Sequence, residues 1–192
     1  MTTQQELTAA ARRLHKAIVA HNVQLVFAES CTGGLISATL ARIPGISAYL
    51  CGSAVVYQKE TKSAWLKIPR RLLAKSDAVS SAVAAEMARN VLIQTPQADV
   101  AASITGHLGP GAPVNLDGRI YVGLAARNRR RPKGRPKIRV IQRQLSGAGK
   151  SGRPEVLRVE RQRQAAIKVL LAVRDFLSTL DEDRRPAESG AG

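Results

Sequence analysis

The sequence contains very little cysteine and no long apolar run. Its two cysteines, Cys31 and Cys51, are too few for a disulfide framework or a cysteine-rich metal site, and we expect neither a metal nor another cofactor. No stretch of about 18 apolar residues occurs, which argues against a membrane span. The first residues lack the basic segment and the following apolar segment of a secretory signal, so we expect a cytoplasmic protein.

Aromatic and acidic residues are also scarce. Aromatic side chains make up 3% of the 192 residues and hydrophobic ones make up 44%, so a core must consist mainly of Ala, Val, Leu and Ile. This length fits one domain with a core of useful size. The 30 Lys and Arg outnumber the 14 Asp and Glu, which gives a net charge of +16.

The basic residues are concentrated in one part of the chain. Residues 127–168 hold 15 of the 30 Lys and Arg but only two acidic residues. The densest segment, 127–137, contains Pro and Gly and is expected to be a loop. Exposed cations there could contact a polyanion such as a nucleic acid. Because no nucleic-acid-binding motif and no interleaved aromatic residues accompany them, we favour an ordinary basic surface over a nucleic-acid partner.

Apolar periodicity and turn residues predict alternating helices and strands. Helices are expected at residues 4–21, 34–43, 59–66, 79–94 and 154–180, and strands at 23–28, 49–57, 98–104, 119–126 and 137–144. The basic loop joins the last two strands like a hairpin, which favours a mixed sheet. We therefore predict one α/β domain over residues 1–180, a three-layer α/β/α domain with a mixed sheet, followed by a disordered tail over 181–192.

The most informative segment is the turn between the first predicted strand and the second predicted helix, Glu29-Ser30-Cys31-Thr32-Gly33-Gly34. Backbone N–H groups at such a turn, and the positive end of the helix dipole, suit anions and oxyanions. Ser30 can act there as a nucleophile if a base lies beside it, or it can cap the helix.

Two kinds of base could serve Ser30. Among the three histidines only His107 is a plausible member of a serine triad, and nothing marks its acidic partner. Lys62 follows a buried-looking strand, and burial would lower its pKa enough for a neutral amine to accept a proton. Tyr57, at the end of that strand, could relay a proton or orient the amine. Taken alone, a helix cap and a solvated lysine are the commoner outcomes.

Several segments carry a resemblance to a known family. They are Ala28-Glu29-Ser30-Cys31-Thr32-Gly33-Gly34, Pro44-Gly45-Ile46-Ser47-Ala48, Val56-Tyr57-Gln58-Lys59-Glu60-Thr61-Lys62, Ala78-Val79-Ser80 and Ser103-Ile104-Thr105-Gly106-His107-Leu108-Gly109-Pro110-Gly111. On these segments the chain resembles the CinA C-terminal-domain family, whose enzymes are PncC-like nicotinamide mononucleotide deamidases. The likeness covers about residues 5–126 and, more loosely, the last predicted helix. Larger members carry a second, N-terminal domain, so this chain is expected to be a stand-alone version.

The resemblance implies a serine–lysine amidohydrolase that converts nicotinamide mononucleotide to nicotinic acid mononucleotide and ammonia. It implies that Ser30 is the nucleophile, Lys62 the base and Tyr57 a supporting hydroxyl. Backbone N–H groups around residues 31–34 would hold the oxyanion, and the turn over 105–111 would approach the ribose phosphate. The expected substrate-binding residues are Cys31, Thr32, Gly33, Gly34, Thr105, Gly106, Gly109 and Arg161.

Some positions in this expected site leave alternatives open. The arginine of the last helix that contacts phosphate is expected to be Arg161, with Arg158 as the alternative. The thiol of Cys31 could be a nucleophile, but a small buried side chain fits better because no base is paired with it. Family members also self-associate, and the apolar helix 79–94 is the expected interface of a homo-oligomer.

The chain departs from the family pattern at three places: His107, Leu116-Asp117-Gly118-Arg119 and residues 147–153. His107 is expected to face solvent rather than to bind phosphate, and Arg119 could replace a lost basic contact. These departures favour two alternatives to the leading activity: an amidase for another amide, and a polyanion-binding module without that activity.

Overall fold

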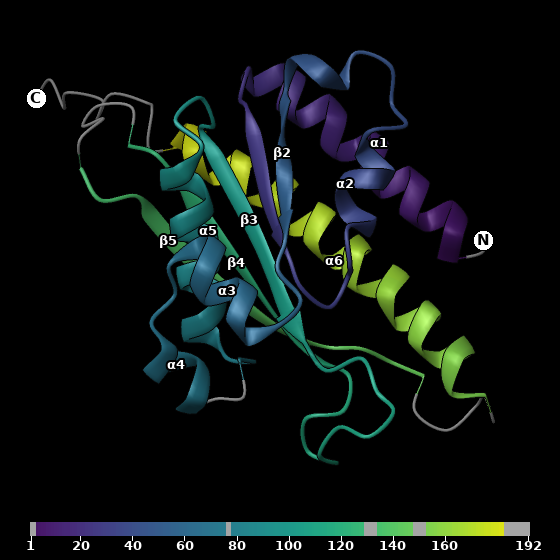
Figure 1. Ribbon diagram of the computed structural model, residues 1–192. Helices are drawn as coiled ribbons and strands as arrows, with labels where there is room; N and C mark the ends of the chain where they lie inside the picture. Colours follow the sequence, from purple (N-terminus) through teal and green to yellow (C-terminus); the bar gives the residue numbers. More distant parts are fainter. Residues whose placement is uncertain (1–2, 76–77, 129–133, 148–152, 183–192) are drawn as a thin grey trace, which may run out of the picture.

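Figure 1 shows the computed structural model of the chain, which describes residues 3–75, 78–128, 134–147 and 153–182. The helices are α1 (Thr3–His21), α2 (Leu35–Leu40), α3 (Lys59–Leu66), α4 (Arg70–Lys75), α5 (Ser81–Gln94) and α6 (Pro154–Glu182), with a short 3-10 helix, η1, at Ile46–Ala48. The strands are β1 (Leu25–Glu29), β2 (Leu50–Val55), β3 (Val100–Gly106), β4 (Arg119–Ala126) and β5 (Lys137–Gln144).

The strands of the described residues form one mixed sheet in the order β2-β1-β3-β4-β5. β1 pairs in parallel with β2 and β3, whereas β4 pairs antiparallel with both β3 and β5. The parallel pairs follow from helical crossovers, since α2 lies between β1 and β2 in the chain and α3 to α5 lie between β2 and β3. The antiparallel β4–β5 pair is the predicted hairpin. The α/β class and the mixed sheet are therefore confirmed.

The two faces of the sheet carry separate hydrophobic cores. Leu25 and Phe27 of β1 point to the core shared with α1, α2 and α6. The alternate residues Val26 and Ala28 point to the core shared with α3, α4 and α5. This period of two is what a strand buried on both faces requires. Figure 1 shows the sheet between the two groups of helices, which gives the predicted three layers.

Helix α5 lies very close to the middle of the sheet. A Cβ atom added to Gly123 of β4 would lie 2.2 Å from the carbonyl oxygen of Ala84, so a larger residue would push the helix away. Ser103 of β3 donates a hydrogen bond of 2.6 Å to the same carbonyl. Most apolar residues of α5 are buried in this packing, whereas Ile93 is 55% exposed. Self-association through this helix stays a prediction.

Most predicted elements agree with the structure in type, and α3, β4 and β5 also have the predicted bounds. The sequence analysis missed α4, because six residues after Pro69 are too few to show a helical period. The predicted helix over 34–43 ends at Leu40, since the chain turns ahead of Pro44. The predicted strand over 49–57 ends at Val55.

Parts of three predicted segments fall outside the described residues: 129–133 of the basic loop, 148–152 and the tail from 183. Residues 181 and 182 belong to α6 rather than to a disordered tail. No helix within the described ranges combines the length and the hydropathy that a membrane crossing requires.

Candidate active site

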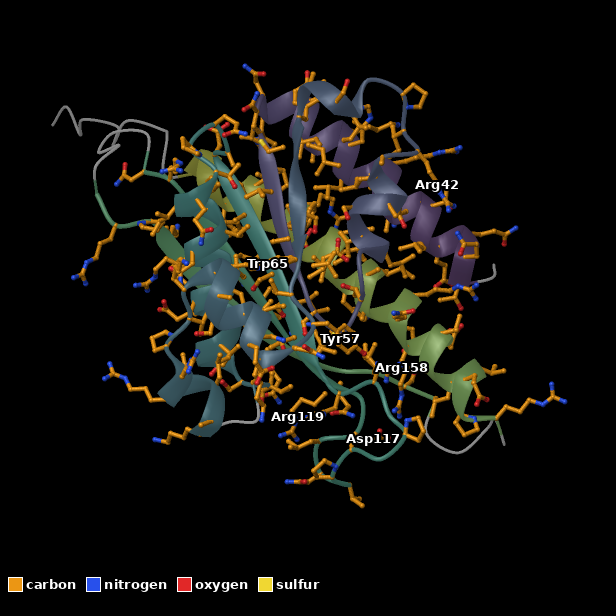
Figure 2. The ribbon with its side chains drawn as sticks, viewed as in Figure 1. Arg42, Tyr57, Trp65, Asp117, Arg119 and Arg158 are labelled. Atoms are coloured by element: carbon orange, nitrogen blue, oxygen red, sulfur yellow. The ribbon has the colours of Figure 1, made fainter. Side chains whose placement is uncertain are left out.

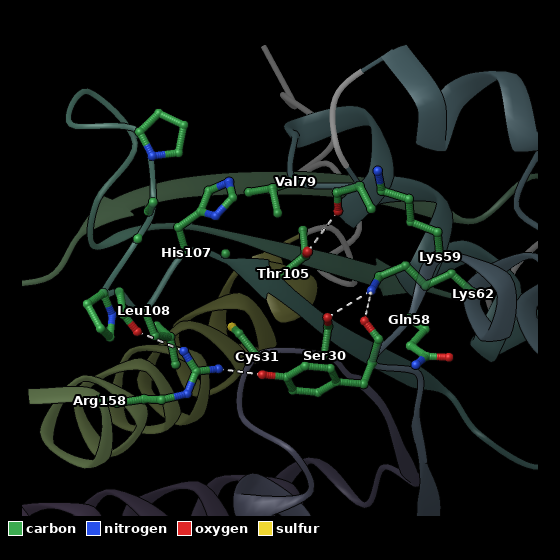
Figure 3. Close-up of a pocket in the computed structure, with 18 of the residues that line it drawn as sticks. Ser30, Cys31, Gln58, Lys59, Lys62, Val79, Thr105, His107, Leu108 and Arg158 are labelled. Carbon is green, nitrogen blue, oxygen red and sulfur yellow. Dashed lines mark hydrogen bonds between the residues drawn. The ribbon is translucent and has the colours of Figure 1, made fainter. Parts of the chain in front are cut away.

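The candidate site lies at the carboxyl ends of the parallel strands. Ser30 directly follows β1, Tyr57 lies two residues after β2, and Gly106 ends β3. Because parallel strands end at the same edge of a sheet, these segments meet there. They enclose a cavity of about 560 Å³ that is also lined by Lys62 and Arg158 (Figure 3). Its volume lies in the range of small-molecule sites.

Ser30 and Lys62 form a buried pair in this cavity. The Lys62 Nζ atom lies 2.8 Å from Ser30 Oγ and 2.9 Å from each of two backbone carbonyl oxygens, those of Val56 and Tyr57. A neutral amine has two N–H donors and one lone pair. The two carbonyls can take the two donors, which directs the lone pair at Ser30. The lysine is 2% exposed, so the alternative of a solvated lysine is wrong.

Burial also sets the charge of this lysine. Removal of the ammonium from water lowers the pKa of Lys62 from 10.5 to about 8, and charges near it, including that of Glu60, only partly oppose the change. Neutral amine is therefore present in a useful fraction near physiological pH. Helix α3 positions the Lys62 side chain. The helix begins after its N-cap, Gln58, which forms a capping box with Thr61. Lys62 therefore lies on the first turn, and its side chain reaches back to the residues that follow β2.

A buried carboxylate organises the turn that carries Ser30. Glu29, which is fully buried, accepts hydrogen bonds from backbone and hydroxyl donors around the turn. Its donors are Thr32 Oγ1, the N–H groups of Gly34, Ile36 and Ser37, Ser37 Oγ and Ser53 Oγ, at 2.8 to 3.1 Å. This carboxylate caps α2 in place of a side chain at the N-cap, Gly34. The sequence analysis missed this role, although an acidic residue just before a glycine-initiated helix is the signal for it.

The backbone donors available for an oxyanion are fewer than expected. The N–H of Gly33 donates to the carbonyl of Ser30, and the N–H of Gly34 donates to Glu29. Within the described residues, the N–H groups of Cys31 and Thr32 donate to no backbone carbonyl of another residue. The predicted set of residues 31–34 is therefore reduced to these two, because the Ser30 carbonyl takes the N–H of Gly33 and Glu29 takes that of Gly34.

Cys31 is a buried residue of the cavity wall rather than a reactive thiol. Its side chain is 4% exposed, and burial raises the pKa of its thiol to about 12. A thiol with that pKa stays protonated at neutral pH and is a poor nucleophile. This agrees with the interpretation of Cys31 as a small buried side chain.

Tyr57 contributes to the site through an unexpected atom. Its backbone carbonyl accepts the hydrogen bond from Lys62, while its hydroxyl accepts one from Arg158 (Figure 3). The ring is 53% exposed. The hydroxyl is thus engaged at the mouth of the cavity instead of with the lysine amine, because the strand ends two residues earlier and the backbone itself reaches Lys62.

The two arginines proposed for phosphate contact occupy different places. Arg158 lines the cavity and donates to the carbonyl of Gly109 at 2.8 Å. Arg161 is fully buried behind the loop and makes two hydrogen bonds of 2.7 Å to Asp117. These bonds lower the pKa of the Asp117 carboxyl. The prediction that Arg161 contacts the substrate directly does not fit this geometry, whereas Arg158 lines the cavity and lies beside Tyr57 (Figure 2).

The loop after β3 forms the opposite wall. Thr105 Oγ1 donates to the carbonyl of Ala78 at 2.9 Å, so its hydroxyl holds two wall segments together. Gly109 has a φ of +62°, and a Cβ there would lie 2.7 Å from Asp117 Oδ1. His107 lines the cavity and is half-buried, which corrects its assignment to solvent. Arg119 does not line the cavity, and its carbonyl accepts the N–H of His107.

The described residues contain no group of three or more His, Cys, Asp and Glu side chains arranged to hold a metal ion. The polar side chains that line the cavity include those of Ser30, Lys62 and Arg158. Such a set can carry out proton transfer and attack on a carbonyl.

The sequence of this chain is similar to a protein family and to several of its members. The family model of the CinA C-terminal domain matches residues 7–142. A CinA-like protein of Dictyoglomus thermophilum is 44% identical over 108 residues, which is 55% of this chain and 26% of that relative. The chain thus spans about a quarter of that relative's length.

Solved structures resemble almost the whole chain. A CinA-superfamily protein from Klebsiella pneumoniae has a TM-score of 0.75 and 24% identity, covering 93% of this chain and 99% of that one. The competence/damage inducible protein CihA from Agrobacterium tumefaciens has a TM-score of 0.71 and 26% identity, covering 94% and 96%. The part of α6 that contributes Arg158 lies outside the residues matched by the family model.

Proposed function

This chain belongs to the family of the CinA C-terminal domain, and on that premise we propose that it is a serine–lysine amidohydrolase. Its proposed reaction is the deamidation of nicotinamide mononucleotide to nicotinic acid mononucleotide and ammonia. The observation that carries the proposal is the buried contact of 2.8 Å between Lys62 Nζ and Ser30 Oγ.

Proton transfer between these two residues accounts for both halves of the reaction. Neutral Lys62 accepts the hydroxyl proton as Ser30 Oγ attacks the carboxamide carbon. The N–H groups of Cys31 and Thr32 are the proposed donors to the oxyanion, and each such donor is worth on the order of 3 kcal/mol. The C–N bond then breaks, and Lys62 returns the proton to the leaving ammonia. Water then attacks the resulting acyl-enzyme with Lys62 as base. The ester C–O bond breaks, Lys62 returns the proton to Ser30 Oγ, and the carboxylic acid is released.

The charge of the cavity supports an anionic substrate such as a nucleotide. Among the described residues that line it, Lys59, Lys62 and Arg158 are cationic and Glu60 is the acid. The guanidinium of Arg158 carries five N–H donors, and its contacts with Tyr57 and Gly109 leave donors for a phosphate. Charge-assisted bonds of this kind favour a phosphorylated amide over a neutral one.

The test is ammonia release from nicotinamide mononucleotide by the wild type and three variants. Ser30→Ala and Lys62→Met should each lower kcat by at least about a thousandfold, since they remove the nucleophile and the base. Lys75→Met, which changes an exposed lysine of α4, is the matched control and should retain full activity. Full ammonia release by folded Ser30→Ala would eliminate the mechanism.

A panel of other amides separates substrate from mechanism. The wild type could be inactive on the mononucleotide but hydrolyse another amide. If Lys62→Met abolishes that activity, the result supports the serine–lysine mechanism and contradicts the proposed substrate. Phosphorylated and unphosphorylated nicotinamide ribosides make the sharpest pair, because Arg158 should distinguish them.

One observation favours a second function, binding of a polyanion. The strand β5 lies at the edge of the sheet and exposes Lys137, Arg139 and Arg143. Affinity for DNA or RNA that falls steeply with salt would support this function, because release of counterions drives such binding. Absent or salt-insensitive binding would exclude it.

A further inference from the structure

One turn of α6 holds all three segments that build the cavity. Arg158 contacts Tyr57 and Gly109, and Arg161 holds Asp117. The third residue, Gln162, reaches the turn that follows Ser30. Its Nε2 donates to the carbonyl oxygens of Cys31 and Thr32 at 3.4 and 3.3 Å. The first two contacts hold the cavity walls, whereas the third acts on the segment that carries the nucleophile.

One of the two carbonyls that Gln162 holds, that of Cys31, belongs to the same peptide unit as a candidate oxyanion donor. The carbonyl of Cys31 and the N–H of Thr32 are in one peptide unit, and in a trans peptide they point to opposite sides. A hydrogen bond that fixes this carbonyl therefore also fixes the direction of the Thr32 N–H. Gln162 lies directly against the turn, since a Cβ on Gly33 would be 3.6 Å from its Nε2.

Gln162 and Glu29 hold the same turn through complementary groups. The carboxylate of Glu29 accepts from the N–H and hydroxyl groups of the turn, including those of Gly34 and Thr32. The carboxamide of Gln162 donates to the carbonyls. Neither residue accepts from the N–H of Thr32, which donates to no backbone carbonyl among the described residues. A turn held from both sides needs little reorganisation when charge develops on the substrate.

We propose that Gln162 is a positioning residue for the oxyanion site: it orients the peptide between Cys31 and Thr32 before substrate binds. This inference rests on the proposed function, because it assumes that Ser30 attacks a carbonyl. It assigns to α6 a part in catalysis that goes beyond holding the cavity walls.

The variants separate a lost donor from lost packing. Gln162→Met keeps the length of the side chain but has no N–H, and it should lower kcat about 10- to 100-fold. This is less than the 100- to 1,000-fold typical when an oxyanion donor is removed outright. KM should stay within about twofold, since the donor acts in the transition state. Gln162→Lys restores an N–H donor and should recover most of kcat.

Gln164→Met is the matched control. Gln164 lies on the same helix, two residues further, and its carboxamide contacts Ser146 and Glu160 rather than the turn. This variant should keep the kcat of the wild type. The unfolding temperature of each variant shows whether the fold is intact.

A second readout does not depend on the identity of the substrate. A fluorophosphonate probe forms a bond from Ser30 Oγ to phosphorus and releases fluoride, and its phosphoryl oxygen occupies the oxyanion site. The rate of labelling, followed by intact mass, should fall about tenfold or more in Gln162→Met and remain unchanged in Gln164→Met. Ser30→Ala should not be labelled.

The outcomes distinguish the two proposals. A wild type that is labelled at Ser30 but does not release ammonia from the mononucleotide contradicts the proposed substrate, and the labelling rates then test Gln162. Labelling and kcat that are the same in Gln162→Met and wild type would overturn the positioning role. The positioning role would also be overturned if Gln162→Lys lost as much kcat and labelling rate as Gln162→Met. A wild type with neither labelling nor activity would overturn both proposals.

Discussion

The burial of Lys62 predicts a specific pH dependence for the proposed reaction. Its pKa is lowered to about 8, and only the neutral amine can accept the proton of Ser30. The neutral fraction is about a tenth at pH 7, a half at pH 8 and nine-tenths at pH 9. We therefore expect kcat/KM to rise about fivefold from pH 7 to 8 and about twofold more from pH 8 to 9.

The assay is ammonia release at substrate concentrations well below KM, from pH 7 to 10, with circular dichroism to verify folding at each pH. The phosphate of the substrate is doubly ionised throughout this range, so its titration does not contribute. A kcat/KM that is flat or falls from pH 7 to 9 would refute the assignment of a buried lysine as base.

A single substitution tests the origin of this pKa. The negative charge of Glu60 raises the pKa of Lys62 against the effect of burial. Glu60→Gln should therefore move the midpoint of the profile to lower pH. Glu86→Gln removes a carboxylate from α5, which is paired with Arg89 instead, and should leave the midpoint unchanged. Equal midpoints in all three proteins would contradict the electrostatic argument.

Further predictions concern stability and binding. The pKa of Lys62 is lower in the folded than in the unfolded protein. The free energy of unfolding of the wild type, measured in urea, should therefore rise by about 2 kcal/mol relative to that of Lys62→Met between pH 7 and 10. A difference between the two proteins that does not change with pH would contradict this. Glu29→Gln should lower the free energy of unfolding by about 2–4 kcal/mol, because it removes the charge that accepts several buried bonds. Arg161→Met should lower the free energy of unfolding by about 1.5–3 kcal/mol, because the partly exposed Asp117 loses its charged hydrogen-bond partner. Arg158→Met should instead raise KM for the mononucleotide about tenfold with little change in unfolding, and the reverse pattern would exchange the roles of the two arginines.

Local sequence patterns predicted most of the elements and the position of Ser30, the proposed nucleophile, at the turn after β1. A short apolar strand followed by Ser30 and two glycines specifies a strand-to-helix turn, because glycines reach positive φ values without strain; Gly33 and Gly34 have φ of +61° and +96°. The spacing from Tyr57 to Lys62 placed the lysine on the first turn of α3, since both the strand and the helix are short-range features.

Only the tertiary structure decided which side chains of α6 meet the candidate site and where each one lies. Arg158, Arg161 and Gln162 lie within five residues on one helix, and nothing in their local sequence shows that the first lines the cavity, the second pairs with Asp117 and the third holds the turn. Their partners lie up to 131 positions away in the chain. Helical periodicity indicates which residues share a face, but the depth at which each meets another segment depends on how the layers pack.

The charge of Lys62, the proposed base, also depends on the tertiary structure. The sequence by itself determined that a lysine and a serine stand after two strands of a mixed sheet, because hydrophobic periodicity and turn residues are local properties of the chain. Only the tertiary structure decided that Lys62 is 2% exposed and that two carbonyls leave its lone pair for Ser30. Desolvation arises from atoms brought together across the fold, so no local pattern could supply the lowered pKa on which the proposed chemistry depends.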